Sequence, residues 1–245
     1  MKKIVIVTII FISIFSSLNI YAQDSRIDTT AIMILDKMAD MIGELSSCKL
    51  TLNSSNDILD VELGPVKYFN THNIYFKGPD KMLINTKGDK GHSGYWYDGS
   101  KLAYYSYSEN NYAIIDAPST IISTIDSINN AYGVDFPAAD FFYPTFTDDL
   151  INQNDEIIFI GKSNIDGQDC FHIIAKNDYT STQIWISDDA LFLPLKYVVN
   201  YFDNKYSTQY QATFSNWELN PVLPDAMFNF NPPEGANKLT LVPKK

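Results

Sequence analysis

The sequence predicts a mainly β protein in which one large, mostly antiparallel sheet packs against helices. Short segments rich in β-branched and aromatic residues follow one another through most of the chain, separated by Gly, Pro, Asn and Asp. Aromatic residues make up 14% of the chain, and rings of this kind suit strands and large interior surfaces. Two apolar stripes at helical spacing supply the dry surface that such a sheet needs.

Residues 1–22 have the features of a secretory signal peptide. Two lysines precede an apolar run from Ile4 to Phe15, and Ala22 is a small residue at the expected cleavage point. The run is short for a membrane span, and no Cys lies near the cleavage point to take a lipid anchor. We therefore expect residues 23–245 to form a single domain and a monomer in the periplasm, without stable membrane insertion. An uncleaved anchor helix is the alternative.

The charge of the chain excludes several classes of partner. The formal net charge is −11, and removal of residues 1–22 takes away two lysines and no acids, which gives −13. A protein this acidic lacks the basic stripe that nucleic acids require, so we expect no nucleic-acid partner. Anionic lipid head groups would also repel most of its surface. After residue 22 the chain has one arginine, Arg26, which leaves few bidentate clamps for phosphate or carboxylate.

Two helices are expected. The first begins near Asp28 or Thr29, either of which could cap it, and its apolar stripe consists of Ala31, Ile34, Leu35, Met38, Ile42 and Leu45. The second is expected to begin with Pro118 at its first helical position and to end at Gly133. Its stripe contains Ile121, Ile122, Ile125 and Ile128. The aromatic stretch that follows, up to Leu150, predicts short helices or an irregular excursion packed against the sheet.

The remaining segments predict about ten strands. Asp98-Gly99 and Asp166-Gly167 are typical of tight hairpin turns. In residues 49–77 the polar groups at Asn53–Asn56 and Asn70–Asn73 suggest breaks between short strands. Residues 182–202 read as strand, corner and strand with large apolar groups on both faces, so we expect the second face to look into a concavity that helices fill incompletely.

Residue types that carry chemistry do not form a recognisable constellation. His72, His92 and His172 have no metal-ligand spacing, and no nucleophile motif or phosphate loop is present, so no metal, cofactor or catalytic residue is expected. The acid pairs Asp148-Asp149 and Asp188-Asp189 read as caps and turn corners. Two readings remain for the cysteines, Cys48 and Cys170: they form a disulfide, or they are two small buried apolar residues.

Four ordered stretches resemble one family. They are "WYDGSKLAYYSYSENNYAIIDAPSTI", "IDGQDCFHIIAK", "QIWISDDALFLPLKYVV" and "FSNWELNPVLPDAMFNFNPPEGANKL". Together with the helical "ILDKMADMIGEL" they resemble the predicted periplasmic proteins grouped as domain of unknown function 2092 (DUF2092). That family is similar to the LolA, LolB and LppX carriers of lipoproteins and lipids. The resemblance implies a LolA-like, half-open barrel of about eleven antiparallel strands wrapped on helices, with an apolar cavity for acyl chains. The carrier's lid is held by an arginine, and no arginine after Arg26 can take that role here.

We therefore expect a non-catalytic carrier or chaperone that binds a lipid, an acyl chain or a lipoprotein in an apolar cavity. The residues chosen to line the cavity, from ring size and strand phase, are Trp96, Tyr104, Ile121, Ile125, Phe141, Phe142, Phe171, Ile173, Ile184, Ile186, Tyr197 and Tyr210. If this phase is right, Ile186→Glu should abolish binding. One alternative is an envelope scaffold whose core is filled by its own side chains and whose partner is another envelope protein. The other is a hydrolase of envelope material, which would need His172 or His92 beside a carboxylate.

Overall fold

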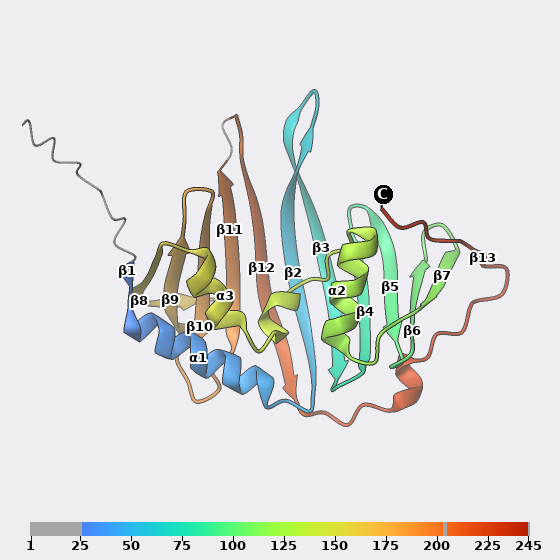
Figure 1. The fold of residues 1–245 in the computed structure, drawn as a ribbon, viewed down its shortest axis with the longest axis horizontal. Coiled ribbons are helices and arrows are strands. Elements are labelled where there is room, and N and C mark those ends of the chain that lie inside the picture. The colour runs from blue at the N-terminus through green and yellow to red at the C-terminus, as the bar shows by residue number, and fades with distance from the viewer. Residues whose placement is uncertain (1–25, 203–204, 245) are drawn as a thin grey trace, which may run out of the picture.

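The structure is a computed structural model that describes residues 26–202 and 205–244. The predicted signal peptide lies outside these residues. In the described part, one open, curled sheet of 13 strands is covered on one face by helices (Figure 1). The strand order is β1-β8-β9-β10-β11-β12-β2-β3-β4-β5-β6-β7-β13. None of the helices in the described ranges is long and apolar enough to cross a membrane.

The sheet consists of two antiparallel meanders that meet where β12 pairs with β2. The first meander is formed by β2 (Ser47–Asp60), β3 (Gly64–Lys77), β4 (Lys81–Gly88), β5 (Gly91–Tyr97), β6 (Lys101–Ser106) and β7 (Asn111–Asp116). The second is formed by β8 (Glu156–Ile165), β9 (Gln168–Lys176), β10 (Thr180–Ser187), β11 (Pro194–Phe202) and β12 (Ser207–Leu219). Each meander ends on a two-residue parallel strand, β1 (Arg26–Ile27) beside β8 and β13 (Asn237–Lys238) beside β7.

The strand count therefore differs slightly from the expected number of about eleven. β1 and β13 account for the difference, since two residues are too few to produce a sequence pattern. The sheet also stays open between these two ends and does not close into a barrel. Both hairpin signals are confirmed, because Asp98-Gly99 joins β5 to β6 and Asp166-Gly167 joins β8 to β9. Asp166 and Gly167 have φ values of 51° and 89°, as the tight primed turn requires.

The predicted breaks within residues 49–77 are wrong. β2 and β3 each run unbroken for 14 residues, with pairing from Ser47 opposite Lys77 to Asp60 opposite Gly64. The polar residues that suggested breaks continue the ladder with their backbones. Their side chains alternate between the two faces of the sheet, so these polar residues form a polar patch within each strand and do not mark its end.

The first helix, α1 (Thr29–Gly43), confirms the predicted stripe. Asp28 is its N-cap, with Oδ1 accepting a hydrogen bond from the Thr30 N–H at 2.8 Å. The predicted stripe residues from Ala31 to Ile42 are buried, and Leu45 packs against them. Two short helices, η1 (Ala139–Phe142) and α3 (Phe146–Gln153), confirm the expected short helices after the second long one. Another, η2 (Asp225–Phe228), lies in the C-terminal segment.

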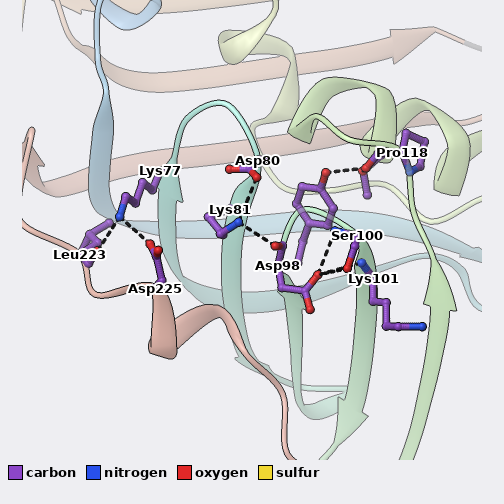
Figure 2. A network of polar contacts seen from close by, with 11 residues as sticks. Lys77, Asp80, Lys81, Asp98, Ser100, Lys101, Pro118, Leu223 and Asp225 are labelled. Carbon is purple, nitrogen blue, oxygen red and sulfur yellow. Dashed lines mark hydrogen bonds and ion pairs between the residues drawn. The ribbon is translucent and has the colours of Figure 1, made fainter.

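The second helix, α2 (Ile121–Tyr132), begins three residues later than predicted. Thr120 is its N-cap, and Gly133 ends it with a φ of 67°. Pro118 lies outside the helix, where its carbonyl accepts hydrogen bonds from the Tyr97 hydroxyl at 2.5 Å and the Thr124 hydroxyl at 3.2 Å. These contacts hold the start of α2 against the end of β5 (Figure 2).

A network of polar contacts lies where β3 ends, β4 begins and β5 ends, and it links the loops there to the C-terminal segment (Figure 2). The Lys81 ammonium donates to the Asp98 carbonyl at 2.7 Å and pairs with Asp80 at 3.0 Å. Lys77 pairs with Asp225 at 2.6 Å and donates to the Leu223 carbonyl at 3.2 Å. The C-terminal segment is therefore anchored before it passes to the far edge of the sheet.

The cysteines behave as small buried apolar residues. Cys48 and Cys170 are both free and buried. Their strands, β2 and β9, are separated by three others, which is about 19 Å at about 4.8 Å per strand. A disulfide requires Cα atoms within about 7 Å, so the two cannot pair in this fold. Burial raises the pKa of the Cys48 thiol to about 12, which keeps it protonated.

Candidate functional site

A pocket of about 780 Å³ opens on the helix-covered face, within the size range of ligand pockets. It lies between α2, the segment 134–140 and the strands β2, β3, β11 and β12. We call it the polar pocket. It is lined by Ser54, Asn56, Asp57, Asn70, His72, Ile125, Asp126, Asn129, Asn130, Val134, Asp135, Phe136, Pro137, Ala138, Ala139, Asp140, Tyr143, Tyr197, Tyr201, Thr208, Gln209 and Tyr210.

Paired residues of β2 and β3 form the floor of the polar pocket. Ser54 pairs with Asn70 in the ladder, and His72 lies two residues further along β3 on the same face. His72 is buried and uses both ring nitrogens: Nε2 lies 2.9 Å from the Ser54 hydroxyl, and Nδ1 lies 2.8 Å from the Thr86 hydroxyl. Burial lowers the pKa of His72 to about 4, so the ring is neutral near pH 7.

Four tyrosines line the pocket walls. Tyr143 comes from the segment between η1 and α3, Tyr197 and Tyr201 come from β11, and Tyr210 comes from β12. The rings of Tyr197 and Tyr210 pack edge to face at 6.2 Å. Burial is the main reason that the pKa of Tyr197 and that of Tyr210 are raised, and the nearby Asp140 carboxylate adds to both shifts. The walls are therefore neutral aromatic surfaces that also carry hydroxyl groups.

A second pocket, of about 300 Å³, lies beside α2, next to the polar pocket and toward the β7 end of the strand order. We call it the apolar pocket. It is lined by Tyr95, Leu102, Tyr104, Ala113, Ile115, Ile128, Tyr132, Val134, Leu241 and Val242. These side chains come from β5, β6, β7, α2 and the C-terminal segment.

The C-terminal segment covers one side of the apolar pocket. Its backbone is held at points on either side of the pocket: the Leu239 N–H donates to the Tyr112 carbonyl at 2.7 Å, and the Lys244 N–H donates to the Ala131 carbonyl at 2.7 Å. Between these points Leu241 faces the pocket, and Val242 lines it while remaining 81% exposed. The pocket is thus bounded on this side by residues 239–244, a short strap whose residues are all exposed.

The two pockets are adjacent. Val134 lines both, and Tyr95 of the apolar pocket packs edge to face on Phe136 of the polar pocket at 5.2 Å. A third pocket, of about 220 Å³, continues the polar pocket toward α3 and shares Asp140, Tyr143 and Tyr197 with it. The helix-covered face therefore has a row of openings with a polar, aromatic centre and an apolar end.

Four of the predicted lining residues line these pockets. Ile125, Tyr197 and Tyr210 line the polar pocket, and Tyr104 lines the apolar pocket. The others on the helix-covered face belong to the packed core or lie against it: Ile121, Phe141, Phe142, Phe171, Ile173, Ile184 and Ile186. Ile173, Ile184 and Ile186 are fully buried, so the chain fills that part of the concavity with its own side chains.

Trp96 lies on the opposite face of the sheet. Its neighbours in β5, Tyr95 and Tyr97, face α2, so strand alternation turns Trp96 away from them. Its ring packs against Phe230 of the C-terminal segment at 5.0 Å and lies 6.4 Å from Tyr107. An aromatic residue in a strand with rings on both faces offers no sequence signal for the choice between them.

The polar lining of the main pocket was not predicted. Ser54, Asn56, Asn70 and His72 were read as parts of strand breaks, and the expected cavity was apolar. A usable signal was present, since these residues alternate with period two and continue the phase of Leu50, Leu52, Ile74 and Phe76. A strand whose inward face changes from apolar to polar is typical of a pocket wall.

Ser54 and His72 form a hydroxyl–imidazole pair, but the surroundings do not suit nucleophilic catalysis. The nitrogen that faces away from Ser54 meets the Thr86 hydroxyl, where a catalytic triad would have a carboxylate. A base whose pKa is lowered to about 4 is also poorly matched to neutral pH. His172 contacts Gln183 at 3.0 Å, and His92 stacks on Tyr107 at 3.9 Å. In residues 26–202 and 205–244, neither of these two histidines forms an ion pair with a carboxylate.

The acid pair Asp188-Asp189 occupies a corner, as expected, but Asp148-Asp149 does not cap a helix, since Thr145 is the N-cap of α3. Asp148 and Asp149 lie in the first turn of α3, and Asp149 accepts a hydrogen bond from the Thr145 hydroxyl at 2.7 Å. Asp188 pairs with Lys162, while Asp189 accepts from the Leu191 N–H at 2.9 Å in the corner between β10 and β11. The described residues contain no group of three or more His, Cys, Asp or Glu side chains that could hold a metal ion.

Comparisons with known proteins give one family match. Residues 31–242 match the model of a family described as predicted periplasmic protein (DUF2092). No curated protein sequence matches the chain significantly.

Among solved structures, the lipoprotein LppX of Mycobacterium tuberculosis is similar at 12% identity and a TM-score of 0.49, covering 80% of this chain and 98% of LppX. LprF of Mycobacterium bovis has 12% identity and a TM-score of 0.48, covering 86% and 99%. A LolA superfamily protein of Nitrosomonas europaea has 12% identity and a TM-score of 0.35, covering 82% and 97%.

Proposed function

The chain belongs to the family of predicted periplasmic proteins described as DUF2092, and from that premise we propose that it binds an amphiphile without chemical conversion. The ligand is a lipid or the acylated part of a lipoprotein, and the protein acts as its carrier or chaperone in the periplasm. We propose that residues 1–22 serve as a signal peptide.

One observation carries this proposal: a polar, aromatic pocket and an apolar pocket lie side by side and share Val134. An amphiphile has the same division into two parts. Its chain would replace water against Ile115, Ile128 and Tyr132 in the apolar pocket, which is favourable because it removes apolar surface from water. Its head group would stay in the polar pocket, where amides and hydroxyls can replace the hydrogen bonds of water.

The surroundings of the apolar pocket also favour an exchangeable occupant. Val242 is largely exposed, and the backbone hydrogen bonds that hold the strap are those of Leu239 and Lys244. Segments with few buried contacts open at low free-energy cost. Displacement of Leu241 and Val242 by an acyl chain would therefore exchange one apolar contact for another and would leave the sheet intact.

A variant that blocks the junction tests the proposal. Val134→Trp places an indole ring between the two pockets, so we expect the affinity for a neutral hydrophobic dye, N-phenyl-1-naphthylamine, to fall about tenfold, which corresponds to about 1.4 kcal/mol. The measurement is dye fluorescence during titration, followed by displacement with a non-ionic alkyl glucoside below its micellar concentration.

Val222→Trp is the matched control, because Val222 is 96% exposed and lies outside the three pockets. It should bind the dye as the wild type does. Urea unfolding of both variants checks that the fold is retained. Equal dye affinities for Val134→Trp and Val222→Trp, or no saturable dye binding by the wild type, would contradict the proposal.

A further inference from the structure

We infer that the polar pocket selects a cationic head group, namely an alkylammonium group, on the amphiphile that the protein binds. The inference rests on the proposed function and adds the charge of the ligand to it. Its basis is the cavity itself, which combines aromatic walls with uncompensated carboxylates.

The charged side chains that line the polar pocket are all acidic. Asp126, Asp135 and Asp140 line the polar pocket, and within the described residues no lysine or arginine does. A fourth carboxylate, Asp57, pairs with Lys67 at 2.9 Å and is therefore compensated. The three aspartates are exposed to solvent, so the attraction of a unit charge to each carboxylate is modest, and the three carboxylates act together on one cation.

The hydrogen bonds to these carboxylates come from neutral donors. The Tyr143 hydroxyl donates to Asp126 at 2.6 Å, and the Asn129 amide donates to Asp135 at 2.5 Å. Such donors orient a carboxylate and leave its charge in place. Asp140 faces the pocket, where partial desolvation raises its pKa and the carboxylates of Asp135 and Asp149 raise it further. A cation in the pocket would favour the ionised form of Asp140 and would therefore oppose the rise in its pKa.

The negative potential of Asp140 reaches the aromatic walls. Burial and then the charge of Asp140 raise the pKa of Tyr201, and the same two causes act on Tyr197 and Tyr210. Aromatic faces attract cations within about 6 Å of the ring centre, and alkylammonium ligands are recognised in this way. Carboxylates and rings therefore favour the same ligand. An organic cation fits better than a metal ion, since residues 26–202 and 205–244 hold no set of metal ligands.

A head-group series tests the inference. Decyltrimethylammonium, decyl glucoside and decyl sulfate share one chain and differ in charge, and each displaces N-phenyl-1-naphthylamine from the full chain at low ionic strength. We expect the ammonium compound to bind at least about tenfold more tightly than the glucoside, and the sulfate to bind most weakly. The advantage of the ammonium compound should shrink as salt is added.

The double variant Asp126→Asn/Asp140→Asn separates the pocket from the general acidity of the surface. In this variant the ratio of ammonium to glucoside affinity should fall several-fold, because Asp135 is the one uncompensated carboxylate left among the described residues of the lining. The control Asp148→Asn, on α3 outside the polar pocket, should keep the wild-type ratio. Urea unfolding of the variants shows whether the fold is retained.

The remaining outcomes separate the inference from the function on which it rests. Equal binding of all three amphiphiles, tightest binding of the glucoside, or a preference for ammonium that is undiminished in the double variant would overturn the inference and leave amphiphile binding standing. Failure of every amphiphile to displace the dye would overturn both.

Discussion

Ile186→Glu is expected to destabilise the fold strongly. Ile186 is fully buried in β10, opposite Phe171 of β9, and belongs to the core that α1 covers. A carboxyl group there would be ionised without a partner or forced to stay protonated. The free energy of unfolding should fall by at least about 3 kcal/mol, a large share of the 5–15 kcal/mol typical of domains.

Urea denaturation measures this effect, with Ile160→Glu as the matched control. Ile160 lies in β8 of the same meander and is 55% exposed, so the same substitution there should change stability by no more than about 0.5 kcal/mol. Similar losses in both variants would contradict the placement of Ile186. Because Ile186 packs the core, its replacement tests the fold and not the ligand site, which is why Val134→Trp is the better test of binding.

His72→Gln is expected to flatten the dependence of stability on pH. Burial lowers the pKa of His72 from 6.5 to about 4 in the folded protein. As the pH falls below 6.5, the unfolded chain binds a proton that the folded protein does not bind until about pH 4. The wild type should therefore lose about 2.5 kcal/mol between pH 7 and pH 4.5 through this one group, and glutamine, which does not ionise, should lose none.

The measurement is the free energy of unfolding of both proteins in urea at pH 7 and pH 4.5. The difference between the two pH values should be about 2.5 kcal/mol larger for the wild type than for His72→Gln. Equal pH dependences would show that the ring is not held neutral on the floor of the polar pocket. Glutamine is chosen because it can still form hydrogen bonds with Ser54 and Thr86.

Periodicity was sufficient to predict most of the fold. The stripe of α1, the two Gly-containing hairpins and the inward faces of β9 to β12 all follow from spacing, because burial of one face repeats every two residues in strands and every three to four in helices. β1 was missed because two residues carry no period. Trp96 was placed on the wrong side because rings occupy both faces of β5.

The pocket was harder to predict than the fold. The volume of a cavity is the small difference between two large volumes: the space that the curved sheet encloses and the side chains that fill it. Spacing in the sequence reports neither quantity. Spacing also misled at the pocket itself. Ser54 and Asn70 are polar residues on the inward face, and their polarity suggested strand ends. Ile184 and Ile186 suggested cavity walls, but they belong to the packed core.

Intermolecular nuclear Overhauser effects between an alkyl amphiphile and the methyl groups of the protein test the central claim most directly. We expect contacts from the alkyl chain to the methyl groups of Ile115 and Ile128 in the apolar pocket, and none to those of Ile184 in the core. Contacts confined to exposed apolar residues elsewhere, such as Val61 and Leu63 between β2 and β3, would contradict it.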